Sequence, residues 1–170
     1  RLAENMPAGN FSPSNVDECI SELRKLMEYP ESVREIPKIL SQFGIRFVVV
    51  EQLSTSKIDG VCFWLDDCSP VIAISLRIGR VDNFWFTLMH EISHLKNGDG
   101  KMNPSIDVDL FGDTEQTESI ETRANEEASE NILAKSEVDN FIARISPLYS
   151  DQLIIGFAKR IDIWPGLVVG

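Results

Sequence analysis

The chain has 170 residues, of which 43% are hydrophobic and 25% are charged, as is ordinary for one soluble globular domain. No apolar run approaches the ~20 residues of a membrane span and no signal-peptide pattern is present, so we expect a cytoplasmic protein with no membrane partner. The formal net charge of −11 disfavours a nucleic-acid surface on this chain, because phosphate backbones are bound by basic patches.

The N-terminal part predicts an arm followed by a helix. Residues 1–13 are small, polar and proline-bearing, which indicates a linker or arm, so the predicted domain is 14–170. Ser14 is a suitable N-cap for a helix whose apolar residues recur at the helical period. Pro30 is predicted to end that helix.

A second helical segment and a small sheet are predicted next. The segment 33–43 has helical periodicity, with a break or restart at Pro37, and Gly44 is predicted to terminate it. Runs of β-branched and aromatic residues then predict three strands, and turn residues between the last two predict a hairpin. The predicted strands span 45–50, 61–65 and 71–75.

The remaining sequence predicts further helices. Asp82 is a suitable N-cap for a helix at 83–97, and the glycine- and proline-bearing stretch 97–116 predicts a long loop. Later helices are predicted at 117–133, at 137–145 after a Ser136 cap, at 151–160 after a Ser150 cap, and as a final turn after Trp164-Pro165. The order of helices, a small three-stranded sheet and more helices predicts an α+β fold.

The two histidines of the chain, His90 and His94, lie in one His-Glu-x-x-His stretch. Residues four apart on a helix share a face, so both imidazoles can bind one metal ion. Glu91 points to a different side of the helix, where it can polarise a metal-bound water. A catalytic zinc normally takes three protein ligands plus water, so a third ligand is required.

The third ligand must be a carboxylate or, less favourably, a cysteine, because no other histidine exists. We favour Glu121, since Ala124 allows close helix packing and the amide oxygen of Asn125, one turn later, can accept the ring N–H of a ligating imidazole. Glu118 is the reserve choice. The full set of glutamates on the helix after the loop is Glu118, Glu121, Glu126, Glu127 and Glu130.

Cysteines and acidic residues give weaker signals. Three cysteines are an odd number, which does not favour a disulfide scaffold and fits a reducing compartment. Cys62 and Cys68 bracket an apolar stretch, and we predict buried free thiols rather than a second metal site. Acidic residues concentrate between positions 99 and 130. We interpret them as a solvated face, with an electronegative rim for metal ions or basic peptides as the alternative.

Two motifs resemble the ImmA/IrrE family of zinc metallopeptidases. Residues 83–94 resemble its Phe-Thr-x-x-His-Glu-x-x-His signature, and residues 121–125 resemble its Glu-x-x-Ala-Asn segment, which opens on a glutamate ligand. The hairpin around Gly60 and the closing segment 157–170 are also similar, so the resemblance covers 33–170. Ser93 stands where members often have glycine, and Glu127 where they often have an aromatic residue.

The resemblance implies a small zincin-like, minimal gluzincin domain with zinc (Zn2+) bound by His90, His94 and Glu121. It implies a hydrolase, a zinc-dependent endopeptidase that cleaves a regulatory protein such as a transcriptional repressor. The metal would activate a water, and Glu91 would take its proton as general base and pass it to the leaving amine. Tyr149 and Arg123 are weak candidates for the donor that stabilises the oxyanion.

Two alternatives stay open. One is a non-proteolytic, metal-binding regulatory module of a transcriptional regulator or antitoxin-like protein, because similar proteins act in transcription regulation, sometimes with a helix-turn-helix (XRE-type) segment fused upstream. Arg1 and Gly170 look like cut ends, so we expect DNA to be reached only through a missing upstream domain. The other alternative is that His90 and His94 are core residues without a metal.

Overall fold

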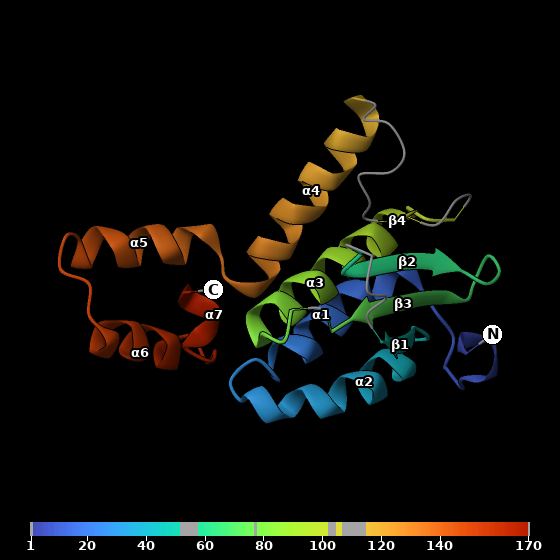
Figure 1. The fold of residues 1–170 in the computed structure, drawn as a ribbon, viewed down its shortest axis with the longest axis horizontal. Coiled ribbons are helices and arrows are strands. Elements are labelled where there is room, and N and C mark those ends of the chain that lie inside the picture. The colour runs from blue at the N-terminus through green and yellow to red at the C-terminus, as the bar shows by residue number, and fades with distance from the viewer. Residues whose placement is uncertain (1, 52–57, 77, 102–104, 107–114, 170) are drawn as a thin grey trace.

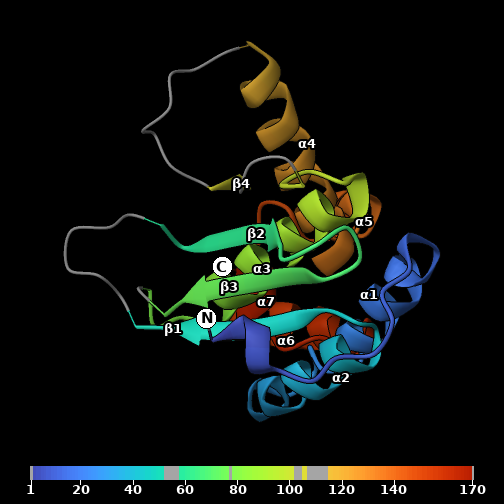
Figure 2. The same ribbon diagram turned by 90° about the vertical axis from the view of Figure 1, so that its right-hand side faces the viewer.

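The computed structural model describes residues 2–51, 58–76, 78–101, 105–106 and 115–169. Figures 1 and 2 show helices before and after a small sheet, as the α+β prediction requires. Helix α3 (Val81–Asn97) packs across strands β2 and β3, and helix α4 (Glu115–Ile132) crosses α3 on another side. This crossing places the predicted histidine motif and the predicted glutamates next to each other.

The three predicted strands are confirmed to within one residue at each end. They are β1 (Arg46–Val50), β2 (Gly60–Trp64) and β3 (Pro70–Ser75). Strands β2 and β3 form the predicted antiparallel hairpin, whereas β1 pairs with β3 in parallel. A short strand not predicted from the sequence, β4 (Ser105–Ile106), pairs with β2 inside the stretch 97–116, so the sheet order is β1-β3-β2-β4.

The first helix begins and ends differently from its prediction. Ser14 lies inside a 3-10 turn (Pro13–Asn15) and is not the N-cap, because α1 (Val16–Arg24) starts only after this turn. The helix also ends well before Pro30, which instead opens a 3-10 helix. A proline suits this position because its missing N–H would have no partner in a first helical turn.

The next helices keep their predicted places with corrected caps. Helix α2 (Ile36–Gln42) starts with Pro37 in its first turn and ends before Gly44, whose φ is +79°. The N-cap of α3 is Arg80 rather than Asp82. Asp82 lies in the first turn, where its carboxylate accepts a hydrogen bond from Arg80 Nε at 3.0 Å and suits the positive end of the helix dipole.

The C-terminal part forms three helices, α5 (Lys135–Ile145), α6 (Asp151–Arg160) and α7 (Gly166–Val169). Ser150 caps α6 as predicted, because its hydroxyl accepts from the Leu153 N–H at 3.4 Å. Ser136 does not cap α5, because the helix begins at Lys135 and its N-cap is Ala134. None of the helices in the described part of the chain is long and apolar enough to cross a membrane.

The N-terminal arm lies against the rest of the protein. The N–H of Gly9 donates to the Ser41 carbonyl at 2.8 Å, and the Ser41 hydroxyl donates to the Pro7 carbonyl at 3.0 Å. The ring of Phe11 packs edge-on against Trp64, with 5.2 Å between the ring centroids. These contacts attach the arm to α2 and β2; the division at residue 14 stays a prediction.

All three cysteines are free thiols, but the predicted burial of one of them is wrong. Cys19 and Cys62 are buried, and burial raises the pKa of the Cys19 thiol to about 12. Cys68 is exposed, because it lies in the turn of the β2–β3 hairpin, where its N–H donates to Asp66 Oδ1 at 2.9 Å. A buried thiol at position 68 is therefore wrong.

The core lies between the sheet and helices α1, α2 and α3. Truncation of a leucine in this core should lower the free energy of unfolding by a large amount. Leu40 on α2 is 0% exposed, so Leu40→Ala should lower the free energy of unfolding by about 2–5 kcal/mol in urea titrations. The matched change Leu153→Ala, at a position that is 43% exposed, should cost about 1 kcal/mol or less. Equal losses for the two variants would contradict this description of the core.

Candidate metal centre

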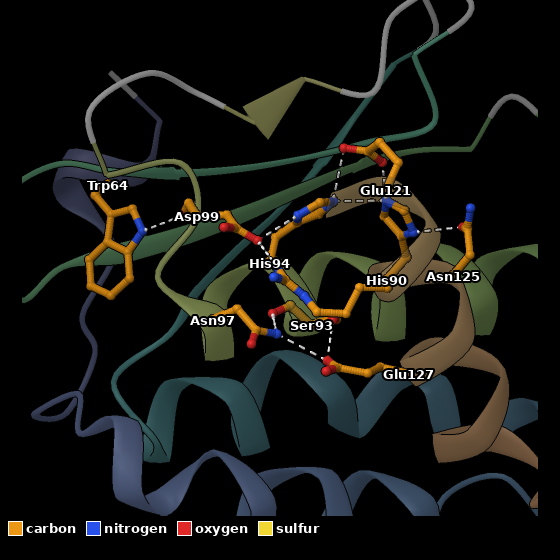
Figure 3. A network of polar contacts seen from close by, with 10 residues as sticks. Trp64, His90, Ser93, His94, Asn97, Asp99, Glu121, Asn125 and Glu127 are labelled. Carbon is orange, nitrogen blue, oxygen red and sulfur yellow. Dashed lines mark hydrogen bonds and ion pairs between the residues drawn. The ribbon is translucent and has the colours of Figure 1, made fainter. Parts of the chain in front are cut away.

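Helix α3 places the two histidines of the motif on one buried face (Figure 3). His90 and His94 are one turn apart, and their Nε2 atoms lie 3.0 Å from each other. Their four-residue spacing puts them on one face, and Gly98 ends the helix directly afterwards in a left-handed conformation, φ +77°. Two imidazole nitrogens therefore point to one place beside α4.

Glu121 on α4 brings a carboxylate to the same place. Its Oε2 lies 3.1 Å from His90 Nε2, and its Oε1 lies 3.5 Å from His94 Nε2. One ligand atom of each of these three residues lies within 4.8 Å of the others, and no other such group of three occurs among the described residues. Glu118, the reserve choice, is exposed and does not belong to this group.

The far sides of both imidazoles are held by oxygen atoms. His90 Nδ1 lies 3.0 Å from Asn125 Oδ1, the contact expected from the sequence. His94 Nδ1 lies 3.2 Å from Asp99 Oδ2. An Nδ1–H that donates to such an oxygen leaves the Nε2 lone pair of the same ring directed at the space beside Glu121. Lone pairs of two nitrogens and a carboxylate oxygen thus converge, and such a group requires a cation between its members.

The charges of the site agree with this requirement. The contacts with His90 and His94 lower the pKa of Glu121 to about 2, so its carboxylate is ionised at neutral pH. Burial disfavours the charged form of His94, but its contacts with Glu121 and Asp99 outweigh burial and raise the pKa of the ring. Two imidazoles and one carboxylate are also a ligand set of catalytic zinc sites, so the residues present fit a divalent metal ion.

Asp99 was not singled out by the sequence analysis, where it belongs to the acidic stretch. It lies just after Gly98, whose left-handed conformation turns the chain back toward the His94 ring. Arg123 Nη2 donates to Asp99 Oδ2 at 2.5 Å, which ties the end of α3 to α4. The sequence signal for Asp99 was an acidic residue directly after a helix-ending glycine, five residues beyond a ligating histidine.

The chain matches a known protein family over a range that includes every residue of this site. The profile of the IrrE N-terminal-like domain, Peptidase_M78, matches residues 40–154, which is more than half of the chain. The chain belongs to this family. The match includes all four strands together with α3 and α4, and it confirms the resemblance found in the sequence. No curated relative matches the chain.

Membership of the IrrE N-terminal-like family indicates the general chemistry of the site. The family is one of metallopeptidases, and the group His90, His94 and Glu121 can hold a metal ion. The other residue predicted to act, Glu91, is 1% exposed and lies on α3 against the first residue of β2, Gly60. Of the two weak candidates for an oxyanion donor, Arg123 donates to Asp99, the residue that contacts His94, and Tyr149 is exposed in the α5–α6 connection.

Two of the positions where this chain departs from the common family pattern, Ser93 and Glu127, contact each other. The Ser93 hydroxyl donates to Glu127, and Asn97 Nδ2 donates to the same carboxylate oxygen at 3.1 Å (Figure 3). A polar network therefore joins α3 and α4 at these positions. Both donors lie on α3, and together they give the Oε2 atom of Glu127 on α4 two hydrogen bonds.

The contact between His90 and Asn125 predicts the effect of removing an amide. Asn125→Ala should weaken zinc binding roughly 10–100-fold, because the His90 ring would lose the acceptor that fixes its orientation. Competition with a chromogenic chelator measures this affinity. Asn125→Asp keeps an acceptor and should bind zinc more tightly than Asn125→Ala, and Glu126→Ala, an exposed neighbour on α4, should bind like the wild type. An unchanged affinity in Asn125→Ala would show that the amide does not orient His90.

Proposed function

We propose that this protein is a zinc-dependent endopeptidase that cleaves a regulatory protein, such as a transcriptional repressor. The observation that carries the proposal is the convergence of His90 Nε2, His94 Nε2 and the Glu121 carboxylate beside a buried glutamate of the same motif. Membership of a metallopeptidase family supports the reaction class. The resemblance to ImmA/IrrE proteins supports the class of substrate.

Each residue has a distinct part in this proposal. His90, His94 and Glu121 would hold the metal, and Asn125 and Asp99 would fix the orientation of the two imidazoles. Bound zinc acts as a Lewis acid and lowers the pKa of a coordinated water toward ~7.

Glu91 would act as the general base and then as the acid. Its carboxylate would accept a proton from the attacking water and then donate that proton to the leaving amine nitrogen. The charge pattern also favours a neutral-to-basic peptide as substrate, because α4 presents an exposed acid, Glu118, one turn before Glu121.

The test is cleavage of a defined substrate. The zinc-loaded chain is incubated with a panel of candidate repressor proteins, and the products are mapped by intact-mass spectrometry. We expect one defined cut in at least one repressor, and no cut when a chelator is present. A chain that carries a full equivalent of zinc and cleaves none of the panel would contradict the proposal and favour a metal-binding regulatory module.

A further inference from the structure

Strand β2 runs beside α3, and two of its residues, Gly60 and Trp64, lie close to residues of the site. Gly60 and Trp64 lie on the same face of the strand, because alternate residues of a strand share a face. Gly60 lies opposite Glu91 of α3, and Trp64, at the other end of the strand, lies beside Asp99, which follows the C-cap of α3. Trp64 Nε1 donates to the Asp99 carbonyl at 3.1 Å.

Gly60 is the point of closest approach between β2 and α3. A Cβ atom added to Gly60 would lie 2.7 Å from Thr87 Cγ2 and still closer to Glu91 Oε1, and real Cβ atoms essentially never come within 3.0 Å. Thr87 and Glu91 are four residues apart on α3, so they share the face that meets the strand, and both are buried. The strand backbone therefore leaves no space for a side chain at position 60.

Glycine is needed at position 60 because β2 and α3 approach each other closely there, and not because of the backbone conformation of the residue. The φ of Gly60 lies outside the positive range that favours glycine, and the residue pairs regularly with Ile74 of β3.

Cys62, two residues along the same face, is also buried. Burial raises the pKa of its thiol, and the negative charges of Glu91 and Asp99 raise it further. The distances from the added Cβ place the Glu91 carboxylate against β2 at Gly60.

We infer that Gly60 is a positioning residue, whose missing side chain lets the backbone of β2 close on the Glu91 carboxylate and fix its location next to the histidines. The inference about packing stands on the contacts of Gly60 alone. Its consequence for the reaction rests on the proposed function. A methyl group at position 60 must push the Glu91 carboxylate away or separate β2 from α3.

The packing is tested by comparing one substitution in two backgrounds of the full chain. In the wild type, Gly60→Ala should lower the thermal unfolding midpoint by roughly 3–10 °C, because the added methyl overpacks a filled site. In a Thr87→Ala/Glu91→Ala background the same substitution should lower it by less than roughly 2 °C, because both obstructing side chains are gone. Gly156→Ala adds the same methyl where no atom lies within 4 Å and should not lower the midpoint.

Equal losses in the two backgrounds, or no loss in the wild type, would overturn the inference. The consequence for the reaction has a separate readout. Gly60→Ala should keep the zinc content and the KM of the wild type and lower kcat roughly 10²-fold, since a displacement of about 1 Å can cost that much. An unchanged kcat would contradict the positioning role. If the wild type cleaves nothing, the proposed function fails, and the unfolding midpoints still decide the packing.

Discussion

Glu91→Gln should retain a full equivalent of zinc and cleave its substrate roughly 10²–10⁴-fold more slowly than the wild type. The amide has the same shape as the carboxylate, so it should fit the same buried space against Gly60 and leave the fold unchanged. It cannot accept a proton as a carboxylate does, so the proton-transfer part of the proposed reaction is lost. Zinc content by mass spectrometry and the cleavage rate are measured on the same preparation.

The matched control for Glu91→Gln is Glu126→Gln, which makes the same chemical change at an exposed position of α4. This control should bind zinc and cleave like the wild type. Normal cleavage by Glu91→Gln would show that Glu91 is not the base. Loss of zinc from Glu91→Gln would instead assign Glu91 to metal binding.

Glu121→Ala should weaken zinc binding roughly 10²–10³-fold and abolish cleavage at ordinary zinc concentrations. The estimate takes one ligand as about a quarter of the ~10–16 kcal/mol with which four-ligand structural sites bind zinc. The physical reason is that Glu121 supplies the ionised carboxylate of the group, whose Oε2 lies 3.1 Å from His90 Nε2 and whose Oε1 lies 3.5 Å from His94 Nε2. Affinity is measured by chelator competition at constant pH.

Glu118→Ala is the matched control for Glu121→Ala, because it removes a glutamate one turn earlier on the same helix. We expect it to bind zinc like the wild type, since Glu118 does not belong to the convergent group. If Glu118→Ala loses zinc and Glu121→Ala retains it, the third ligand is Glu118 and the arrangement of α4 described above is wrong.

The sequence could predict those parts of the site that depend on spacing along one helix. His90 and His94 lie one turn apart, as do Glu121 and Asn125, so a correct helix assignment already places each pair on one face. The strands were predictable because β-branched runs mark them. Their order was not, since the parallel pairing of β1 with β3 depends on how separate segments meet and no local pattern records it.

Other features depend on packing or on small differences in helix ends. Ser14, Asp82 and Ser136 are good N-cap residues in isolation, but each helix starts one or more residues away from the predicted cap because turns or neighbouring residues already begin it. The contact of Asp99 with His94 arises from the turn made by Gly98. The constraint on Gly60 becomes visible only when β2 lies against α3.

If the protein is a metal-dependent peptidase centred on His90, His94 and Glu121, cleavage must depend on zinc, and titration of zinc into the metal-depleted chain measures this dependence. We expect no cleavage before zinc is added, a rate that rises in proportion to zinc, and a plateau at one equivalent per chain. Cleavage by the metal-depleted chain, or no cleavage once one equivalent is bound, would contradict it.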